Sequence, residues 1–176
     1  EWHAIVLNSE LVVNTGFTDA DRTAQEEWLA QDLKDSQKPC TLAYWHHPRF
    51  SSGWHGGDPR IGAFWRSLYD SGADLIMNGH DHEYGRFLPQ TPEGIADSVK
   101  GLTQIVVGTG GGELRGFRNP ITPNSATRIQ GHFGQARQLD ADPEGVLGLG
   151  DVDRGGERRG LTGGRSEDAR EHLVEL

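Results

Sequence analysis

The chain has 176 residues, with 26 acidic and 17 basic side chains and a formal net charge of −9. This acidic balance argues against a protein that holds a nucleic-acid backbone on a broad basic face, although metal ions can still hold an anionic substrate. No apolar run approaches the roughly 18 residues that span a bilayer, so we expect no membrane insertion. Cys40 is the only cysteine, which excludes an intrachain disulfide. The length fits one domain with a core of its own.

The first forty residues predict a strand followed by a helix. Residues 4–7 form an apolar run that reads as a strand already under way, so we expect the chain to begin inside a domain. Residues 11–13 fit a second short strand or a turn. Thr23 and Glu26 stand at capping-box spacing and predict a helix that begins near Thr23. Its expected apolar face consists of Trp28, Leu29 and Leu33.

The middle of the chain predicts two strands joined by a helix. Thr41–Trp45 and Leu75–Met77 are short apolar runs typical of buried strands. Between them, Arg49–Asp58 is rich in Ser and Gly and predicts a loop where substrate contacts would lie. Apolar residues at helical spacing predict a helix over Pro59–Ser71, and Gly72 fits its C-terminal stop.

The second half of the chain contains one further clear strand. Residues 88–101 carry the three breakers Pro89, Pro92 and Gly94 and are expected to form an excursion. Thr103–Val107 predicts a strand, and the glycines of 108–112 let the backbone approach another group closely, by position either the site or an ordinary loop neighbour. From residue 135 to 176 the chain is dense in Gly, Arg and acidic residues. We expect this tail to be disordered or foreign to the rest.

Histidines follow both central strands directly. His46 and His47 come after the first strand, and His80 and His82 come after the second, beyond the bend that Gly79 permits. Because ligands gather beyond the carboxyl ends of strands in open sheets, we expect both sets on one rim. Imidazoles in such a pattern are typical of a metal site.

These segments resemble the last two metal motifs of the calcineurin-like metallophosphoesterases, in the purple acid phosphatase branch. The motifs are Tyr44-Trp45-His46-His47-Pro48 and Gly79-His80-Asp81-His82, and the similarity extends to Leu7–Ser9, Gln25–Leu29, Tyr84–Phe87 and Val106–Gly111. The resemblance implies an α/β fold, a sandwich of two mixed β-sheets flanked by helices whose N-terminal half is missing. Residues 1–134 would then be the C-terminal part of the catalytic domain, and the family favours an extracellular or periplasmic location.

The resemblance also implies a metal centre that hydrolyses phosphate esters. His46 and His80 would bind one ion and His82 the other, the two ions being Fe, Zn or Mn with a bridging hydroxide as the nucleophile. His47 matches no ligand position and is expected to support the ligands or to pack against them. Asp81 could orient an imidazole through its other ring nitrogen or be a solvated turn residue.

His55 would be a catalytic proton donor to the leaving group, with a surface-loop histidine as the alternative. Tyr84 and Arg86 follow residues 79–82, which we call the metal loop, and fit either the pocket lining or ordinary packing. At Gly85 the family usually has a glutamate, so a local ion pair there is not expected.

The carboxylate ligands of the family are absent from this sequence. An Asp-x-His, a Gly-Asp and a Gly-Asn-His segment would precede the motifs found here, and none is present. By itself the chain should therefore bind metal weakly and turn over little. Two other hypotheses stay open: a truncated or degenerate non-catalytic domain, and a mononuclear zinc hydrolase that uses His46, His80 and His82 around one ion.

Overall fold

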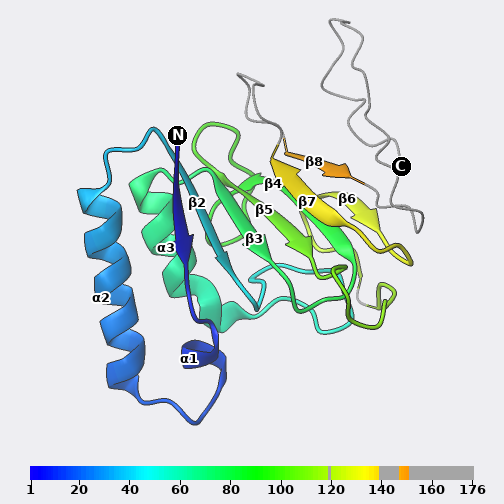
Figure 1. Cartoon of the computed structure of the whole chain (residues 1–176), viewed down its shortest axis with the longest axis horizontal. Coiled ribbons are helices and arrows are strands. Elements are labelled where there is room, and N and C mark those ends of the chain that lie inside the picture. Colours follow the sequence, from blue (N-terminus) through cyan, green and yellow to red (C-terminus); the bar gives the residue numbers. More distant parts are fainter. Residues whose placement is uncertain (119, 139–146, 151–176) are drawn as a thin grey trace, which may run out of the picture.

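The structure is a computed structural model, and it describes residues 1–118, 120–138 and 147–150. Its centre is a mixed six-stranded sheet with helices packed on one face (Figure 1). The helices are α1 (Glu10–Val13), α2 (Asp19–Asp35), η1 (Pro59–Ile61) and α3 (Gly62–Ser71). The strands are β1 (Trp2–Val6), β2 (Cys40–Trp45), β3 (Leu75–Asn78), β4 (Tyr84–Gln90), β5 (Leu102–Val107), β6 (Ser125–Ile129), β7 (Gln135–Gln138) and β8 (Leu147–Gly150).

The strand order of the main sheet is β1-β2-β3-β5-β4-β6, and β7 pairs with β8 in a separate antiparallel sheet. Strands β1, β2, β3 and β5 run parallel, whereas β4 is antiparallel to both β5 and β6. The α/β class expected from the sequence is confirmed, and the main sheet is mixed as expected, whereas the second described sheet is two-stranded and antiparallel. Most of the tail predicted from residue 135 lies outside the described residues.

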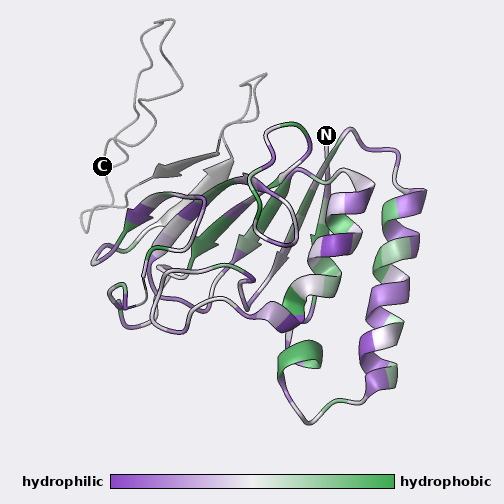
Figure 2. Cartoon of the chain, turned by 180° about the vertical axis from the view of Figure 1, so that it is seen from behind, coloured by the Kyte–Doolittle hydropathy of each residue, from purple (hydrophilic) through white to green (hydrophobic). Residues whose placement is uncertain are grey.

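The main core lies between the sheet and the helices. Leu29 of α2 and Phe64, Trp65 and Leu68 of α3 pack on inward residues of the parallel strands. A smaller cluster on the opposite face contains strand residues only. Figure 2 shows the same division, with apolar strands in the middle and polar outer faces on the helices. Within the described part of the chain, no helix is both long and apolar enough to cross a bilayer.

Three predictions near the N-terminus were wrong. Residues 10–13 form helix α1 rather than a strand or turn. Helix α2 begins at Asp19, not near Thr23, because Thr18 and Asp21 form the capping box there. Trp28 is 49% exposed and does not belong to the apolar face, which consists of Leu29 and the partly buried Leu33.

The connection between β2 and β3 confirms the prediction for this region. Asp58 caps η1 by accepting a hydrogen bond from the Arg60 amide, and the helical segment then runs to Ser71. It ends at Gly72, whose φ of 77° is the left-handed conformation that glycine adopts most easily. This helix carries the chain back so that β3 lies parallel to β2.

Candidate metal centre

The ends of β2 and β3 place the histidines on one rim, as the sequence predicted. Trp45 and Asn78 are register partners in the parallel pair, so the residues that follow leave the sheet side by side. Two hydrogen bonds secure this point: Asn78 Nδ2 donates to the Trp45 carbonyl at 3.1 Å, and Gly79 N donates to the His46 carbonyl at 3.1 Å. The rim therefore begins at a fixed point of the core.

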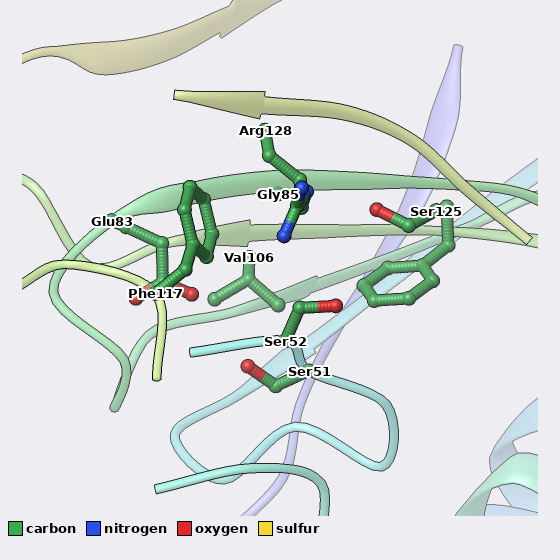
Figure 3. A pocket seen from close by; sticks show the side chains of 9 residues that line it. Ser51, Ser52, Glu83, Gly85, Val106, Phe117, Ser125 and Arg128 are labelled. Carbon is green, nitrogen blue, oxygen red and sulfur yellow. The ribbon is translucent and has the colours of Figure 1, made fainter. Parts of the chain in front are cut away.

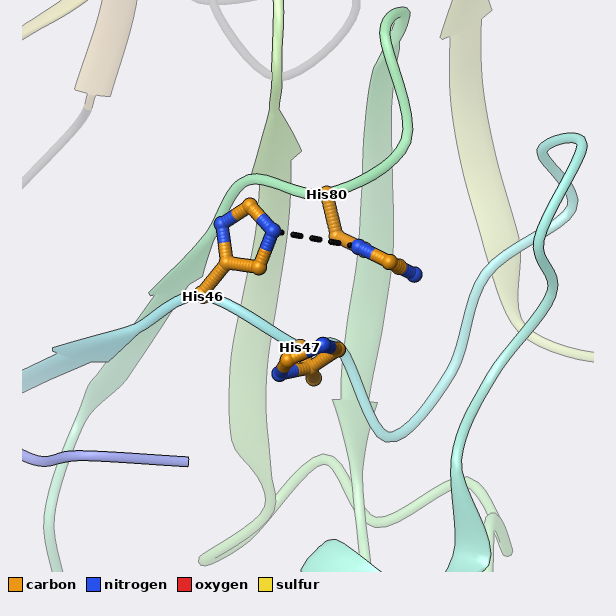
Figure 4. Close-up of side chains that lie close together, drawn as sticks. All are labelled: His46, His47 and His80. Carbon is orange, nitrogen blue, oxygen red and sulfur yellow. Dashed lines mark hydrogen bonds between the residues drawn. The ribbon is translucent and has the colours of Figure 1, made fainter. Parts of the chain in front are cut away.

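His46 and His80 face each other directly. His46 Nε2 and His80 Nδ1 are 3.1 Å apart, and Figure 4 shows the two rings with His47 beside them. Among the described residues, the ligand atoms of His46, His47 and His80 lie within 4.8 Å of one another. Two nitrogen ligands about 2.1 Å from one ion would be separated by about 3.0 Å at a right angle and about 3.4 Å at the tetrahedral angle. The observed separation fits this range.

Burial keeps the His80 imidazole uncharged. The pKa of His80 is lowered to about 4, first by burial and then by the neighbouring His47, His55 and His46, while Asp81 opposes this shift. Metal binding requires the neutral ring. The backbone of His80 has a φ of 67°, in the left-handed region that histidine seldom adopts. Perturbed titration and backbone strain thus occur at the same residue, a combination typical of functional positions.

His47 is held from behind by helix α1. Buried Ser9 accepts a hydrogen bond from the His47 amide at 3.2 Å, and its hydroxyl lies 2.8 Å from His47 Nδ1. The other ring nitrogen faces Glu10 Oε1 at 3.8 Å. In the tautomer in which Nδ1 accepts from the Ser9 hydroxyl, the ring proton lies on Nε2 towards Glu10, and neither nitrogen has a free lone pair for a metal. His47 therefore supports the His80 ring, whose centroid is 4.5 Å away, better than it would bind an ion.

His82 points to a different partner. Its Nδ1 is 2.5 Å from the Glu113 carbonyl, which can only accept, so Nδ1 carries the proton and Nε2 is free. This is the arrangement that orients a metal-binding histidine. His82 does not share the group formed by His46, His47 and His80. It lies instead where the glycine loop after β5 reaches the rim.

Glycines of that loop bring its backbone against the metal loop. A Cβ on Gly108 would lie 1.9 Å from the Asp81 carbonyl oxygen, and one on Gly112 would lie 2.8 Å from the His82 ring. By contrast, a Cβ on Gly110 would have nothing within 4 Å. The close approach expected from this glycine run is thus present at its two ends.

Asp81 holds the loop after β2 instead of an imidazole. It is fully buried, its Oδ2 accepts a hydrogen bond from the Ser51 hydroxyl, and its Oδ1 accepts one from the His55 amide at 2.7 Å. The Ser51 oxygen accepts in turn from Gly53 N at 3.0 Å. Asp81 is therefore not a solvated turn residue. It fixes the position of His55 relative to the histidine motif.

His55 lies beside the cluster, as the sequence analysis expected. Its ring centroid is 4.3 Å from that of His80. Its Nε2 is 2.7 Å from Arg115 Nη1, and because a guanidinium only donates, Nε2 accepts in this contact. No sequence pattern marks Arg115 as a site residue, because only the folded path of the glycine loop brings it to His55.

An open cleft of about 620 Å³ adjoins these rings. Its lining includes His47, His55, His80 and Arg60. Asp58 neutralises Arg60 through a 2.6 Å ion pair, and this hydrogen-bonded pairing lowers the pKa of Asp58. The cleft therefore gives a ligand access to the edge of the histidine cluster.

Glu83 is a second buried carboxyl beside Asp81, and no pattern in the sequence signals it. It is 1% exposed, and burial together with the Asp81 charge raises its pKa to about 8, so it is mostly protonated at neutral pH. Figure 3 shows it with Ser51, Phe117 and Arg128 around a space too small for a water molecule. A Cβ on Gly53 would lie 2.3 Å from Glu83 Oε1, so Gly53 allows this packing. Tyr84 is buried in the smaller core cluster, so packing explains this residue.

Comparisons with known proteins place the strand-end histidines inside a family match. Residues 5–84 match the calcineurin-like phosphoesterase family. Purple acid phosphatase 18 of Arabidopsis thaliana is 31% identical over 142 residues, which are 75% of this chain and 30% of that protein. These similarities support a place for the chain among the calcineurin-like phosphoesterases, in their purple acid phosphatase-like branch.

One further curated protein and two solved structures extend the comparison. Purple acid phosphatase 15 of Arabidopsis thaliana is 36% identical over 73 residues, or 38% of this chain and 14% of that protein. The structure of the yellow lupin purple acid phosphatase PPD1 matches with a TM-score of 0.61 and 20% identity over 77% of this chain and 26% of its own. GAP50, the anchor in the inner membrane complex of Plasmodium, matches with a TM-score of 0.67 and 16% identity over 89% and 47%.

At such low identities the two structures show the shared fold alone. The chain spans about 30% of the length of the first relative and 14% of the second. Both of the motifs that carried the resemblance, around His46 and around His80, fall inside the family match at residues 5–84.

Proposed function

We propose that this calcineurin-like phosphoesterase chain supplies the histidine ligands of a dinuclear metal centre that hydrolyses phosphate esters. His46 and His80 would bind one ion of Fe, Zn or Mn, and His82 would bind the second through Nε2. When bound, the ions would activate a hydroxide and withdraw charge from the phosphate. The observation that carries this proposal is the 3.1 Å separation of His46 Nε2 and His80 Nδ1 at two neighbouring strand ends.

The other residues of the rim have supporting roles in this proposal. His47 buttresses His80, and Asp81 positions the amide of His55. His55 would stand over the substrate as the group closest to the leaving alcohol, where proton donation is needed. For that step it must exchange its contact with Arg115 for one with the substrate. An extracellular or periplasmic location belongs to the same proposal.

Metal binding to the full chain tests this proposal. Equilibrium dialysis against Zn²⁺ and Mn²⁺ should show a bound ion that is lost in His46→Ala and in His80→Ala. His3→Gln is the matched control, because His3 lies in β1 and pairs with Asp32 of α2 at 2.8 Å, outside the cluster. The control should bind metal as the parent does. Equal binding by the parent and both alanine variants would refute the assignment.

The stoichiometry separates this proposal from the two other hypotheses. In a chain completed with the family's carboxylate segments, two ions that depend on His80 and His82 favour the dinuclear centre. One ion together with hydrolysis favours a mononuclear zinc hydrolase. No bound ion under any condition favours a degenerate, non-catalytic domain.

A further inference from the structure

Two arginines of the loop after β5 contact two consecutive residues of the loop after β2. Arg115 Nη1 is 2.7 Å from His55 Nε2, and the Arg118 guanidinium lies 4.1 Å from the centre of the Trp54 ring. Trp54 itself is 47% exposed. The cations and the indole therefore form one surface, which we call the arginine rim: Trp54, His55, Arg115 and Arg118.

The backbone that carries these arginines is anchored at both ends. Arg115 N donates to the His82 carbonyl at 3.2 Å, and His82 Nδ1 donates to the Glu113 carbonyl. Two residues beyond Arg115, Phe117 N donates to Gln130 Oε1 at 2.9 Å. The loop after β2 is fixed as well, since Asp81 accepts from the His55 amide. The two loops are thus held in place by contacts to the metal loop and to the residue after β6.

Both arginines lack an acidic partner in the described part of the chain. None of the ion pairs there involves Arg115 or Arg118, whereas Arg60 pairs with Asp58 and Arg66 pairs with Glu93. Arg49, Arg86 and Arg128 also have no ion pair among the described residues, so what distinguishes Arg115 and Arg118 is that both lie in one loop and contact neighbouring residues. Guanidinium groups bind phosphate through paired N–H donors more effectively than ammonium groups do.

The arginine rim lies one side chain outward from the histidine cluster. The His55 ring stands next to His80, and Arg115 contacts the Nε2 atom of that ring. A phosphate held at the histidines would therefore have the imidazole of His55 between itself and Arg115. The arginines are placed for a different anionic group of the same molecule.

We propose that Arg115 and Arg118, with the exposed indole of Trp54, form a second anion subsite that takes a phosphate group other than the one hydrolysed. The preferred substrates would then be esters that carry at least two phosphates. This substrate class rests on the proposed function of the neighbouring histidines. The phosphate subsite itself requires only the arginine rim.

The test measures binding of inorganic phosphate to the full chain after metal removal with a chelator. Without metal, the arginine rim is the expected phosphate site. Isothermal titration calorimetry at low ionic strength should show that Arg115→Gln and Arg118→Gln each weaken phosphate binding about tenfold, the loss of one charge-assisted hydrogen bond. Arg115→Lys should recover only part of the affinity, because it keeps the charge but loses the paired donors.

Arg66→Gln is the matched control, because Arg66 lies on α3 and pairs with Glu93 away from the rim. It should bind phosphate as the parent does. Parent affinity in Arg115→Gln, or equal weakening in Arg66→Gln, would overturn the subsite. The metal-binding test of the histidines is independent. If Arg115→Gln loses phosphate binding while the parent binds no metal, the subsite stands and the proposed hydrolysis is refuted.

Discussion

His80 combines an unusual backbone with its place in the histidine cluster. Its φ is 67°, and among the non-glycine residues that the structure describes only Asn124 also has a positive φ. For a residue with a Cβ this conformation costs roughly 1–2 kcal/mol. Hydrogen bonds on both sides hold it, from Gly79 N to the His46 carbonyl and from Asp81 N to the Gly79 carbonyl. The fold therefore keeps a strained residue where its ring meets His46.

The strain can be measured by comparing His80→Gly with His80→Ala. Both substitutions remove the imidazole, and they differ only in the Cβ. The glycine variant should be more stable by about 0.5–1 kcal/mol, because relief of the left-handed strain exceeds the entropy that glycine gains on unfolding. Urea unfolding followed by tryptophan fluorescence would give the difference in the free energy of unfolding.

The matched control makes the same exchange on a regular helix. Ala24 is exposed on α2, and Ala24→Gly there should lower the stability by about 1 kcal/mol, as glycine does in helix interiors. The sign of the alanine-to-glycine effect should thus be opposite at the two positions. An alanine variant at residue 80 as stable as the glycine variant would show that the backbone is not strained.

Among single residues, those at strand ends were predictable and those in long loops were not. The apolar runs before His46 and His80 placed both histidines on one rim, because parallel neighbours end at the same edge. Arg115 and the Glu113 carbonyl reach the site only through the folded path of the glycine loop. Such contacts join residues far apart in sequence, and local patterns carry no signal for them.

The loop after β5 depends on glycine at position 108 far more than at position 110. Gly108→Ala would place a Cβ 1.9 Å from the Asp81 carbonyl oxygen, so the loop or the metal loop must move. We expect a loss of about 1–3 kcal/mol, as for overpacked cores. Gly110→Ala, with open space at its Cβ, should change the stability by less than about 0.5 kcal/mol.

Thermal or urea unfolding of the two variants provides the comparison. If Gly108→Ala were as stable as Gly110→Ala, the close approach of the two loops would be incorrect. Phosphate binding by the arginine rim should also weaken in Gly108→Ala and persist in Gly110→Ala, because the loop carries Arg115.

Helix α3 is joined to the excursion after β4 by a phenol–carboxylate hydrogen bond. Tyr69 Oη donates to Asp97 Oδ2 at 2.7 Å, and this bond is the main reason that the pKa of Tyr69 is raised to about 12 from its usual 10.0. The bond also lowers the pKa of Asp97. The stabilisation by Tyr69 is therefore complete below about pH 10 and is lost as the pH rises to about 12.

Ultraviolet absorbance of the phenolate would follow this titration, with Tyr69→Phe identifying the late-titrating group. Asp97→Asn should move the transition towards pH 10, and Asp35→Asn on α2 should leave it unchanged. A Tyr69 transition that does not respond to Asp97→Asn would exclude the hydrogen bond as the cause of the raised pKa.

The strands differ in how clearly the sequence pattern predicts them. Strands β2, β3 and β5 are apolar runs and were predicted. Strand β4 was not predicted, because its second half contains Pro89, which reads as a breaker; the structure accommodates this proline by a register shift between Phe87 and Gln90. Strand β6 is short and only partly buried, so its alternation is weak. Tertiary pairing, not local pattern, defines these two strands.

The two faces of the main sheet differ across the whole molecule. The helix-covered face buries Ile5, Ala43 and Trp45, whereas Val6 and Tyr44, register partners on the opposite face, are 59% and 44% exposed. The helices thus stabilise the sheet from one side and keep the strand ends in register. The histidine cluster, its cleft and the arginine rim depend on this one-sided support.

The charge balance of the cluster limits what residues 1–176 can do alone. The grouped ligand atoms are all imidazole nitrogens, and the buried Asp81 is occupied by Ser51 and the His55 amide. A pair of divalent ions needs carboxylates to offset their mutual repulsion, and imidazoles supply no negative charge. We therefore expect no metal-dependent hydrolysis of p-nitrophenyl phosphate by residues 1–176, although an ion can bind weakly at His46 and His80.

Release of p-nitrophenol with Zn²⁺, Mn²⁺ or Fe³⁺ present would measure this. His80→Ala is the informative comparison, since it removes a proposed ligand, while His3→Gln leaves the cluster intact. Robust turnover that disappears in His80→Ala and survives in His3→Gln would mean that imidazoles suffice for the chemistry. In that case a centre without carboxylates, the mononuclear alternative, would replace the dinuclear one, because one cation has no second charge to repel.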